Sequence, residues 1–101
     1  MDAQQRVATF VENHEMDAPV VYRLLDVVSE LGEVAKDATE STDYGAHPED
    51  VDLSADEFGD ALFALLALGD AADIDAEQAL DGALEKYEGR ITDSGSPSSG
   101  E

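Results

Sequence analysis

Two apolar, helix-periodic segments near the middle of the chain each carry a pair of carboxylates three residues apart. The segments are VVSELGEVAK and DEFGDALFALLAL, and their pairs are Glu30 with Glu33 and Glu57 with Asp60. Residues three apart lie on one face of an α-helix, about a turn from each other. If the two helices pack antiparallel, the four carboxylates converge, and they cannot all stay ionised without a cation between them. Hard oxygen ligands of this kind suit Mg²⁺ or Mn²⁺.

The spacing of apolar residues along the rest of the chain predicts an all-α, four-helix bundle-like fold. The predicted helices span residues 2–14, 19–39, 54–72 and 75–91. Asp17 is expected to cap the second helix, with Pro19 in its first turn, and Asp75 is expected to cap the fourth. Residues 40–53, ESTDYGAHPEDVDL, lack this periodicity and therefore predict a loop.

The length of 101 residues allows one small domain with a modest core. We predict this domain over residues 1–91, followed by a disordered polar tail, TDSGSPSSGE, over residues 92–101. The segment from Ala61 to Ala72 is apolar nearly all round, which is typical of a helix that is central or pressed against another subunit. We therefore expect a homodimer or homotetramer, formed through the alanine and leucine surface of the helix at 54–72.

The formal net charge is −20, from 25 acidic and five basic residues. Such self-repulsion opposes folding unless counterions screen it, which happens strongly only at high salt. We therefore expect a cytoplasmic protein of a salt-accumulating, halophilic organism, while an acidic mimic of nucleic acid remains the alternative. Direct nucleic-acid binding is not expected, because no basic stripe is present. The sequence contains no cysteine and no apolar run of membrane-spanning length, and we expect no signal peptide.

Among the four carboxylates, Asp60 is the one for which the sequence alone gives the strongest argument for a role in ligand binding. It shares a helical face with Ala64 and Ala67, whereas large side chains crowd the opposite side of that helix: Phe58, Leu62, Leu65 and Leu66. Small neighbours leave room for a ligand, and a charge in such a place needs a partner. Glu57 has a structural alternative, because Ser54 and Glu57 match a capping box in which the Glu57 carboxylate returns to the Ser54 backbone. The alternative for Glu33 is an ordinary solvated residue.

The E-x-x-E, gap, E-x-x-D arrangement, together with the helix ADIDAEQALDGALEKYEGR, resembles the MazG-like all-α nucleoside triphosphate pyrophosphohydrolases over roughly residues 4–90. Ser29 stands where that family often has a further glutamate. The resemblance implies that the two carboxylate pairs bind Mg²⁺ and that water cleaves the substrate between its α and β phosphorus. The products would be a nucleoside monophosphate and pyrophosphate.

The few cations and one loop aromatic are candidates for contacts with a nucleotide. Lys36, Lys86 and Arg90 are the candidate phosphate-binding residues, because a positive charge stabilises the negative charge of the departing pyrophosphate. Tyr87 stands where the family often has asparagine. The alternative for Lys86 and Arg90 is an exposed helix end whose cations favour the C-terminal dipole. Tyr44, in the loop, is the candidate for stacking on a nucleobase.

The function that the sequence predicts is Mg²⁺-dependent nucleoside triphosphate pyrophosphohydrolysis in nucleotide-pool housecleaning. Two alternatives remain open at this point. One is the related phosphoribosyl-ATP pyrophosphohydrolase, which shares the architecture and the leaving group. The other is a non-catalytic acidic helical adaptor.

Overall fold

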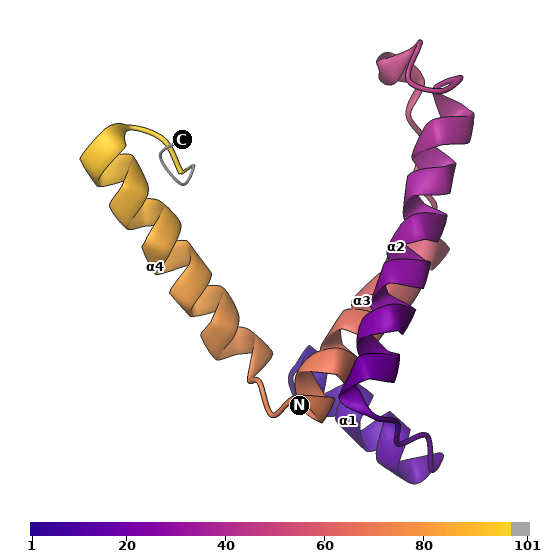
Figure 1. Ribbon diagram of the computed structural model, residues 1–101, viewed down its shortest axis with the longest axis vertical. Coiled ribbons are helices and arrows are strands. Elements are labelled where there is room, and N and C mark those ends of the chain that lie inside the picture. Colours follow the sequence, from indigo (N-terminus) through magenta and orange to yellow (C-terminus); the bar gives the residue numbers. More distant parts are fainter. Residues whose placement is uncertain (98–101) are drawn as a thin grey trace.

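The computed structural model describes residues 1–97, and all regular structure in this part of the chain is helical. The four α-helices are α1 (Ala3–Asn13), α2 (Val20–Ser41), α3 (Ala55–Ala71) and α4 (Ala76–Ser94), and a short 3-10 helix, η1, spans Pro48–Asp50 (Figure 1). The predicted all-α fold with four helices is confirmed, and each helix end lies within three residues of its predicted position. None of the helices in residues 1–97 combines the length and the apolar character needed to cross a membrane.

Local capping explains most of the helix ends. Asp2 and Gln5 form a reciprocal capping box at the start of α1, and Asp75 accepts a hydrogen bond from the Gln78 backbone N–H at the start of α4, as predicted. The start of α2 differs from the prediction. Pro19 itself occupies the N-cap position with extended backbone and no side-chain cap, so Asp17 does not cap this helix.

The end of α4 also differs from the prediction. The helix continues to Ser94, three residues into the segment predicted as a disordered tail, and ends at Gly95, whose φ of 77° is left-handed. Residues 98–101 of that predicted tail lie outside the described residues.

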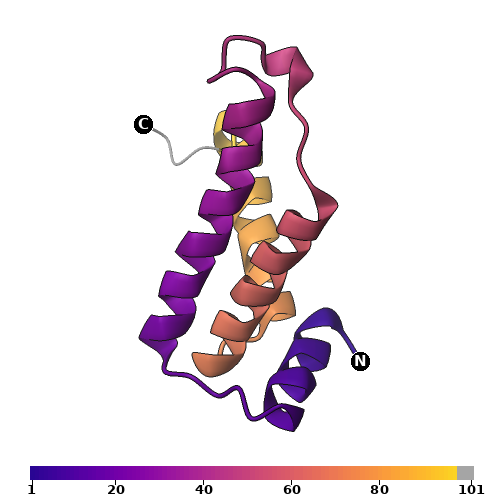
Figure 2. The ribbon, with the colours of Figure 1, turned by 90° about the vertical axis from the view of Figure 1, so that its right-hand side faces the viewer.

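The core forms where α3 packs antiparallel to α2 and α1 crosses α3 (Figure 2). Its most buried side chain is Ala64, which is 1 % exposed, and the other buried apolar residues are also small: Val11, Val27, Ala61 and Ala67. The alanine side of α3 is therefore used inside the chain, because it lets α2 approach closely. The prediction that these alanines face a second subunit is wrong, whereas Leu62 and Leu65 on the opposite side do remain exposed.

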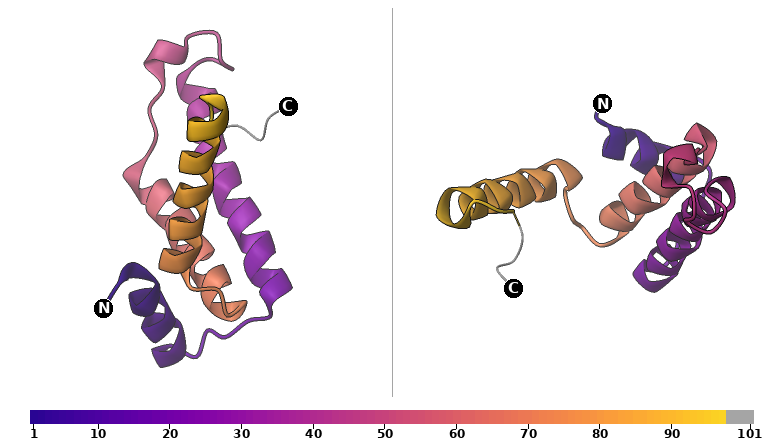
Figure 3. Two further views of the ribbon diagram at one scale, coloured as in Figure 1. Left: turned by 90° about the vertical axis from the view of Figure 1, so that its left-hand side faces the viewer. Right: turned by 90° about the horizontal axis from the view of Figure 1, so that it is seen from above.

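Helix α4 diverges from the other three helices and forms a wide V with α3 (Figures 1 and 3). The side-chain amide of Gln4, on α1, holds the linker between α3 and α4. Its Nε2 donates to the Ile74 carbonyl at 2.7 Å, and its Oε1 accepts from the Ala76 N–H at 2.8 Å. The direction in which α4 leaves the core is thus fixed by a residue 70 positions earlier in the chain.

Candidate metal centre

Carboxylates from α2 and α3 meet beside the first turns of α3. Glu30 on α2 and Glu57 and Asp60 on α3 each offer a carboxylate oxygen, and these three oxygens lie within 4.8 Å of one another. Glu30 and Glu57 are half-buried, whereas Asp60 is exposed. The antiparallel packing of α2 on α3 therefore brings together three of the four predicted ligands.

The environment of Glu30 disfavours its charged form. Partial burial is the largest cause that raises the pKa of this carboxyl group above its ordinary value. The neighbouring negative charges that raise this pKa further are those of Asp60, Asp26 and Glu33. A cation at this position would relieve both effects, because it replaces lost hydration and offsets like charge.

Glu57 is in the same situation at the start of α3. Partial burial again comes first among the causes that raise its pKa. The negative charges that add to it are those of Glu33, Asp37, Asp60 and Asp56. Two half-buried carboxyl groups therefore share one crowded, acidic position.

Glu33, the fourth predicted ligand, lies at the edge of this group. It is exposed on α2, and its oxygens are not among the three that lie within 4.8 Å of one another. Its charge nevertheless raises the pKa of both Glu30 and Glu57. Glu33 thus faces the site without joining the closest set of oxygens.

Asp37 decides how the Glu57 carboxylate is used. Ser54 Oγ accepts a hydrogen bond from the Glu57 N–H at 3.2 Å, which is half of the capping box. The other half is replaced, because the Ser54 N–H donates to Asp37 Oδ2 at 3.2 Å instead of to Glu57. The Glu57 carboxylate is therefore not needed for the cap and remains directed to the acidic group.

Sequence reasoning missed Asp37 and Asp26. Both lie on the acidic side of α2, where Asp26, Glu30, Glu33 and Asp37 follow one another at intervals of four, three and four residues. This spacing places all four along one side of a helix. This spacing can be read from the sequence, but it does not predict which of the four carboxylates contacts α3.

The predicted phosphate-binding cations lie elsewhere in residues 1–97. Lys36 is exposed on α2, and its Nζ lies 3.8 Å from Glu40 Oε1. Lys86 and Arg90 both lie near the ring of Tyr87 on α4, at 5.1 and 5.8 Å from its centroid. Because α4 diverges from α2 and α3 (Figure 1), a single chain does not bring these two cations to the carboxylates.

Tyr44 lies in the loop that follows α2. Its side chain is 86 % exposed, and it lines a shallow pocket of about 340 Å³ with residues such as Ala38 and Thr42. Thr42 is 12 residues beyond Glu30, a separation of about 18 Å along a helix. Tyr44 thus lies beyond the C-terminal end of α2, whereas Glu30 lies at the middle of this helix, and one chain does not join the two.

The same loop carries a second set of side chains with possible ligand atoms, His47, Glu49 and Asp50. All three are fully on the surface, and His47 Nδ1 lies 3.7 Å from Glu49 Oε1. Their ligand atoms also lie within 4.8 Å of one another, but none of the three residues is even partly buried. The half-buried group on α2 and α3 is therefore the stronger candidate for a metal centre.

Comparison with known proteins gives no independent assignment for this centre. No known protein family, no curated protein and no solved structure matches the chain.

Proposed function

We propose that this chain is a Mg²⁺-dependent nucleoside triphosphate pyrophosphohydrolase that releases a nucleoside monophosphate and pyrophosphate. The observation that carries the proposal is the convergence of Glu30, Glu57 and Asp60 from two helices, with ligand oxygens within 4.8 Å of one another. We further propose that the protein acts in nucleotide-pool housecleaning, in the cytoplasm of a salt-accumulating organism, as a homodimer or homotetramer.

The donor set fits Mg²⁺, and Mn²⁺ as a substitute, because all the ligand atoms are carboxylate oxygens. Raised pKa values at Glu30 and Glu57, caused first by partial burial, also support a cation-binding role. When bound, the ion would supply the positive charge that a triphosphate needs to approach a chain of net charge −20.

The chain's own residues would then divide the remaining tasks. Glu30, Glu57 and Asp60 would bind the ion and so position the phosphate chain. Glu33, which faces the site from its edge, is the carboxylate free to orient the attacking water and accept its proton. Lys36 is the exposed cation on the same helix, whereas Lys86 and Arg90, on the diverging α4, are not assigned a role within a single chain.

The test is pyrophosphate release from a panel of nucleoside triphosphates, measured at high salt with and without Mg²⁺. We expect Mg²⁺-dependent release that falls by at least about 100-fold in Glu57→Gln and Asp60→Asn, since each removes a ligand charge. Asp70→Asn is the matched control, because it removes one charge from the opposite end of α3 and should leave release unchanged.

The same assay separates the proposal from its alternatives. Release from phosphoribosyl-ATP but from none of the triphosphates would favour the related pyrophosphohydrolase. No release from any of these substrates by a folded, Mg²⁺-supplied protein would overturn the enzymatic proposal and leave the acidic adaptor.

A further inference from the structure

Helix α4 exposes a continuous apolar stripe. Leu80, Leu84, Tyr87 and Ile91 follow one another at intervals of four, three and four residues, so they lie on one side of the helix. Their side chains are between 42 % and 56 % exposed. Within residues 1–97 no other helix packs along this stripe (Figure 3).

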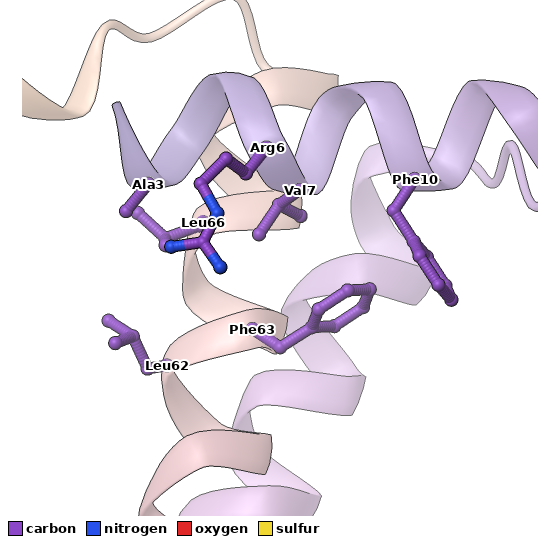
Figure 4. Close-up of a pocket in the computed structure, with 7 residues that line it drawn as sticks. All are labelled: Ala3, Arg6, Val7, Phe10, Leu62, Phe63 and Leu66. Atoms are coloured by element: carbon purple, nitrogen blue, oxygen red, sulfur yellow. The ribbon is translucent and has the colours of Figure 1, made fainter. Parts of the chain in front are cut away.

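Helix α3 exposes a matching apolar side, which we call the α3 apolar face and which consists of Phe58, Leu62, Leu65 and Leu66. Phe58, Leu62 and Leu65 are between 44 % and 61 % exposed. Apolar hollows flank this face on both sides. One, of about 560 Å³, lies between α1 and α3 (Figure 4), and the other, of about 280 Å³, lies between α2 and α3. Leu62 lines both hollows, so the apolar surface is continuous across α3.

The two apolar surfaces cannot meet within one chain as it is folded. Gln4 holds both the Ile74 carbonyl and the Ala76 N–H, and the Ile74 N–H donates to the Gly69 carbonyl at 2.8 Å. These bonds direct α4 away from its own α3. In this fold the occupant of the α3 apolar face therefore comes from elsewhere.

The size of the exposed surface indicates a second copy of the chain. The chain exposes 7357 Å², whereas a compact monomer of this mass exposes about 5,500 Å². Two copies thus carry an excess of about 3,700 Å² together, which lies within the range of about 2,000–5,000 Å² buried by obligate dimers. The radius of gyration agrees, because it is 16.7 Å against about 13 Å for a compact domain of this length.

Charge also suits α4 as the occupant. Arg6 reaches from α1 across the hollow between α1 and α3 (Figure 4) and has no ion-pair partner among the described residues. Helix α4 carries Asp81, Glu85 and Glu88 on one side of its apolar stripe, whereas Lys86 and Arg90 lie on the other side. A cation on the receiving side can therefore pair with the acidic side of α4.

We propose that two copies of this chain associate by exchanging α4, so that the apolar stripe of each α4 packs on the α3 apolar face of the other copy. The surfaces are the same in both copies, so the contact closes with two-fold symmetry. This inference does not depend on the reaction proposed above.

The first test is the molar mass of the full chain by sedimentation equilibrium at high salt. We expect a dimer, or a multiple of one, for the wild type and for Gln78→Glu. Leu84→Glu and Leu65→Glu should weaken association by at least about 100-fold, since each places a charge in an apolar contact. Gln78→Glu is the matched control, because it adds the same charge to α4 away from the stripe. A monomeric wild type, or a Leu84→Glu chain that still associates normally, would overturn the proposal.

The second test uses the absence of cysteine from the chain and does not require a destabilised variant. Leu84→Cys chains are co-refolded with Leu62→Cys chains of different mass and treated with a short bismaleimide. We expect a crosslink between the two unlike chains, and no such product when Gln78→Cys replaces Leu84→Cys. Crosslinks only between like Leu62→Cys chains would mean that α3 packs on α3, and would contradict the exchange of α4.

Discussion

Glu57 has two competing uses at the start of α3, and Asp37 decides between them. A capping box would direct its carboxylate to the Ser54 N–H. In the folded chain that N–H is already bonded to Asp37 Oδ2, so the Glu57 carboxylate joins Glu30 and Asp60 instead.

This competition gives a prediction for Asp37. Asp37→Ala should leave the Ser54 N–H free to bind the Glu57 carboxylate, and should therefore weaken the rise in unfolding temperature that Mg²⁺ produces. Asp37→Asn is the control, since its side-chain carbonyl can still accept from Ser54. Thermal denaturation of both variants with and without Mg²⁺ would check this. Equal responses in the two variants would show that Asp37 acts only through its charge.

The raised pKa values of Glu30 and Glu57 predict how stability depends on pH. Partial burial, followed by neighbouring negative charge, raises both above the ordinary value of 4.5. Just above pH 4.5 the folded state therefore binds more protons than the unfolded state, so the free energy of unfolding falls as pH rises through that window. Without divalent ions, we expect the melting temperature to increase as the pH is lowered towards 4.5.

The pH dependence caused by Glu30 and Glu57 must be distinguished from that of the many other acidic residues. The measurements are therefore made at constant high salt and repeated on two variants. Glu57→Gln removes one of the two crowded carboxyl groups and should flatten the pH dependence. Glu85→Gln removes the same charge from α4 and should leave the dependence as in the wild type. A wild-type melting temperature that falls steadily over this range would contradict the assignment.

At the scale of the elements, the junction between α3 and α4 depends on a close contact at Gly69. A Cβ at this position would lie 2.8 Å from Gln4 Nε2 and 3.3 Å from the Ile74 carbonyl oxygen. The same Gln4 amide holds the linker through two hydrogen bonds. Gly69 therefore leaves room for the contact that sets the direction of α4.

Two glycine substitutions test this role. Gly82→Ala, on α4, meets nothing within 4 Å and should stabilise the fold by about 0.5–1 kcal/mol through its higher helix propensity. Gly69→Ala should not stabilise the fold in this way. The Gln4 amide must move to make room for the new Cβ, and its hydrogen bonds are each worth about 1 kcal/mol. Chemical denaturation would compare the two. An equal gain from both substitutions would show that the Gln4 contact contributes little to stability.

At the scale of the whole molecule, the net charge of −20 is spread over an open, V-shaped chain (Figure 1). The described residues contain few ion pairs that offset it, Lys36 with Glu40 and His47 with Glu49, and both are exposed. Exposed pairs of this kind contribute little to stability. Screening by dissolved salt is therefore the main way to reduce the repulsion.

This predicts a strong dependence of stability and association on salt. Raising KCl from about 0.05 M to about 1 M shortens the screening distance from more than 10 Å to about 3 Å, so the melting temperature and the dimer fraction should both rise steeply. Sucrose, which favours compact states without screening charge, is the control and should have a smaller effect on association. A melting temperature that does not change with KCl would contradict the role of self-repulsion.

The sequence by itself determined the positions of the helices and the acidity of the chain. Apolar periodicity, the Asp75 cap and the loop composition at residues 40–53 act within a few residues, so they can be read without knowing the fold. The first carboxylate pair and the second were identified in the same way. The two pairs come together because α2 and α3 pack antiparallel, an arrangement that a single loop between two long helices favours.

Tertiary structure alone decided which contacts form between distant parts of the chain. It placed Asp37 on Ser54 and left Glu33 at the edge of the carboxylate group. It buried Arg23, whose guanidinium donates to the Met16 carbonyl, and it set the direction of α4 through Gln4. The last contact joins residues 70 positions apart, and no local pattern specifies such a partner, because it depends on how whole helices pack.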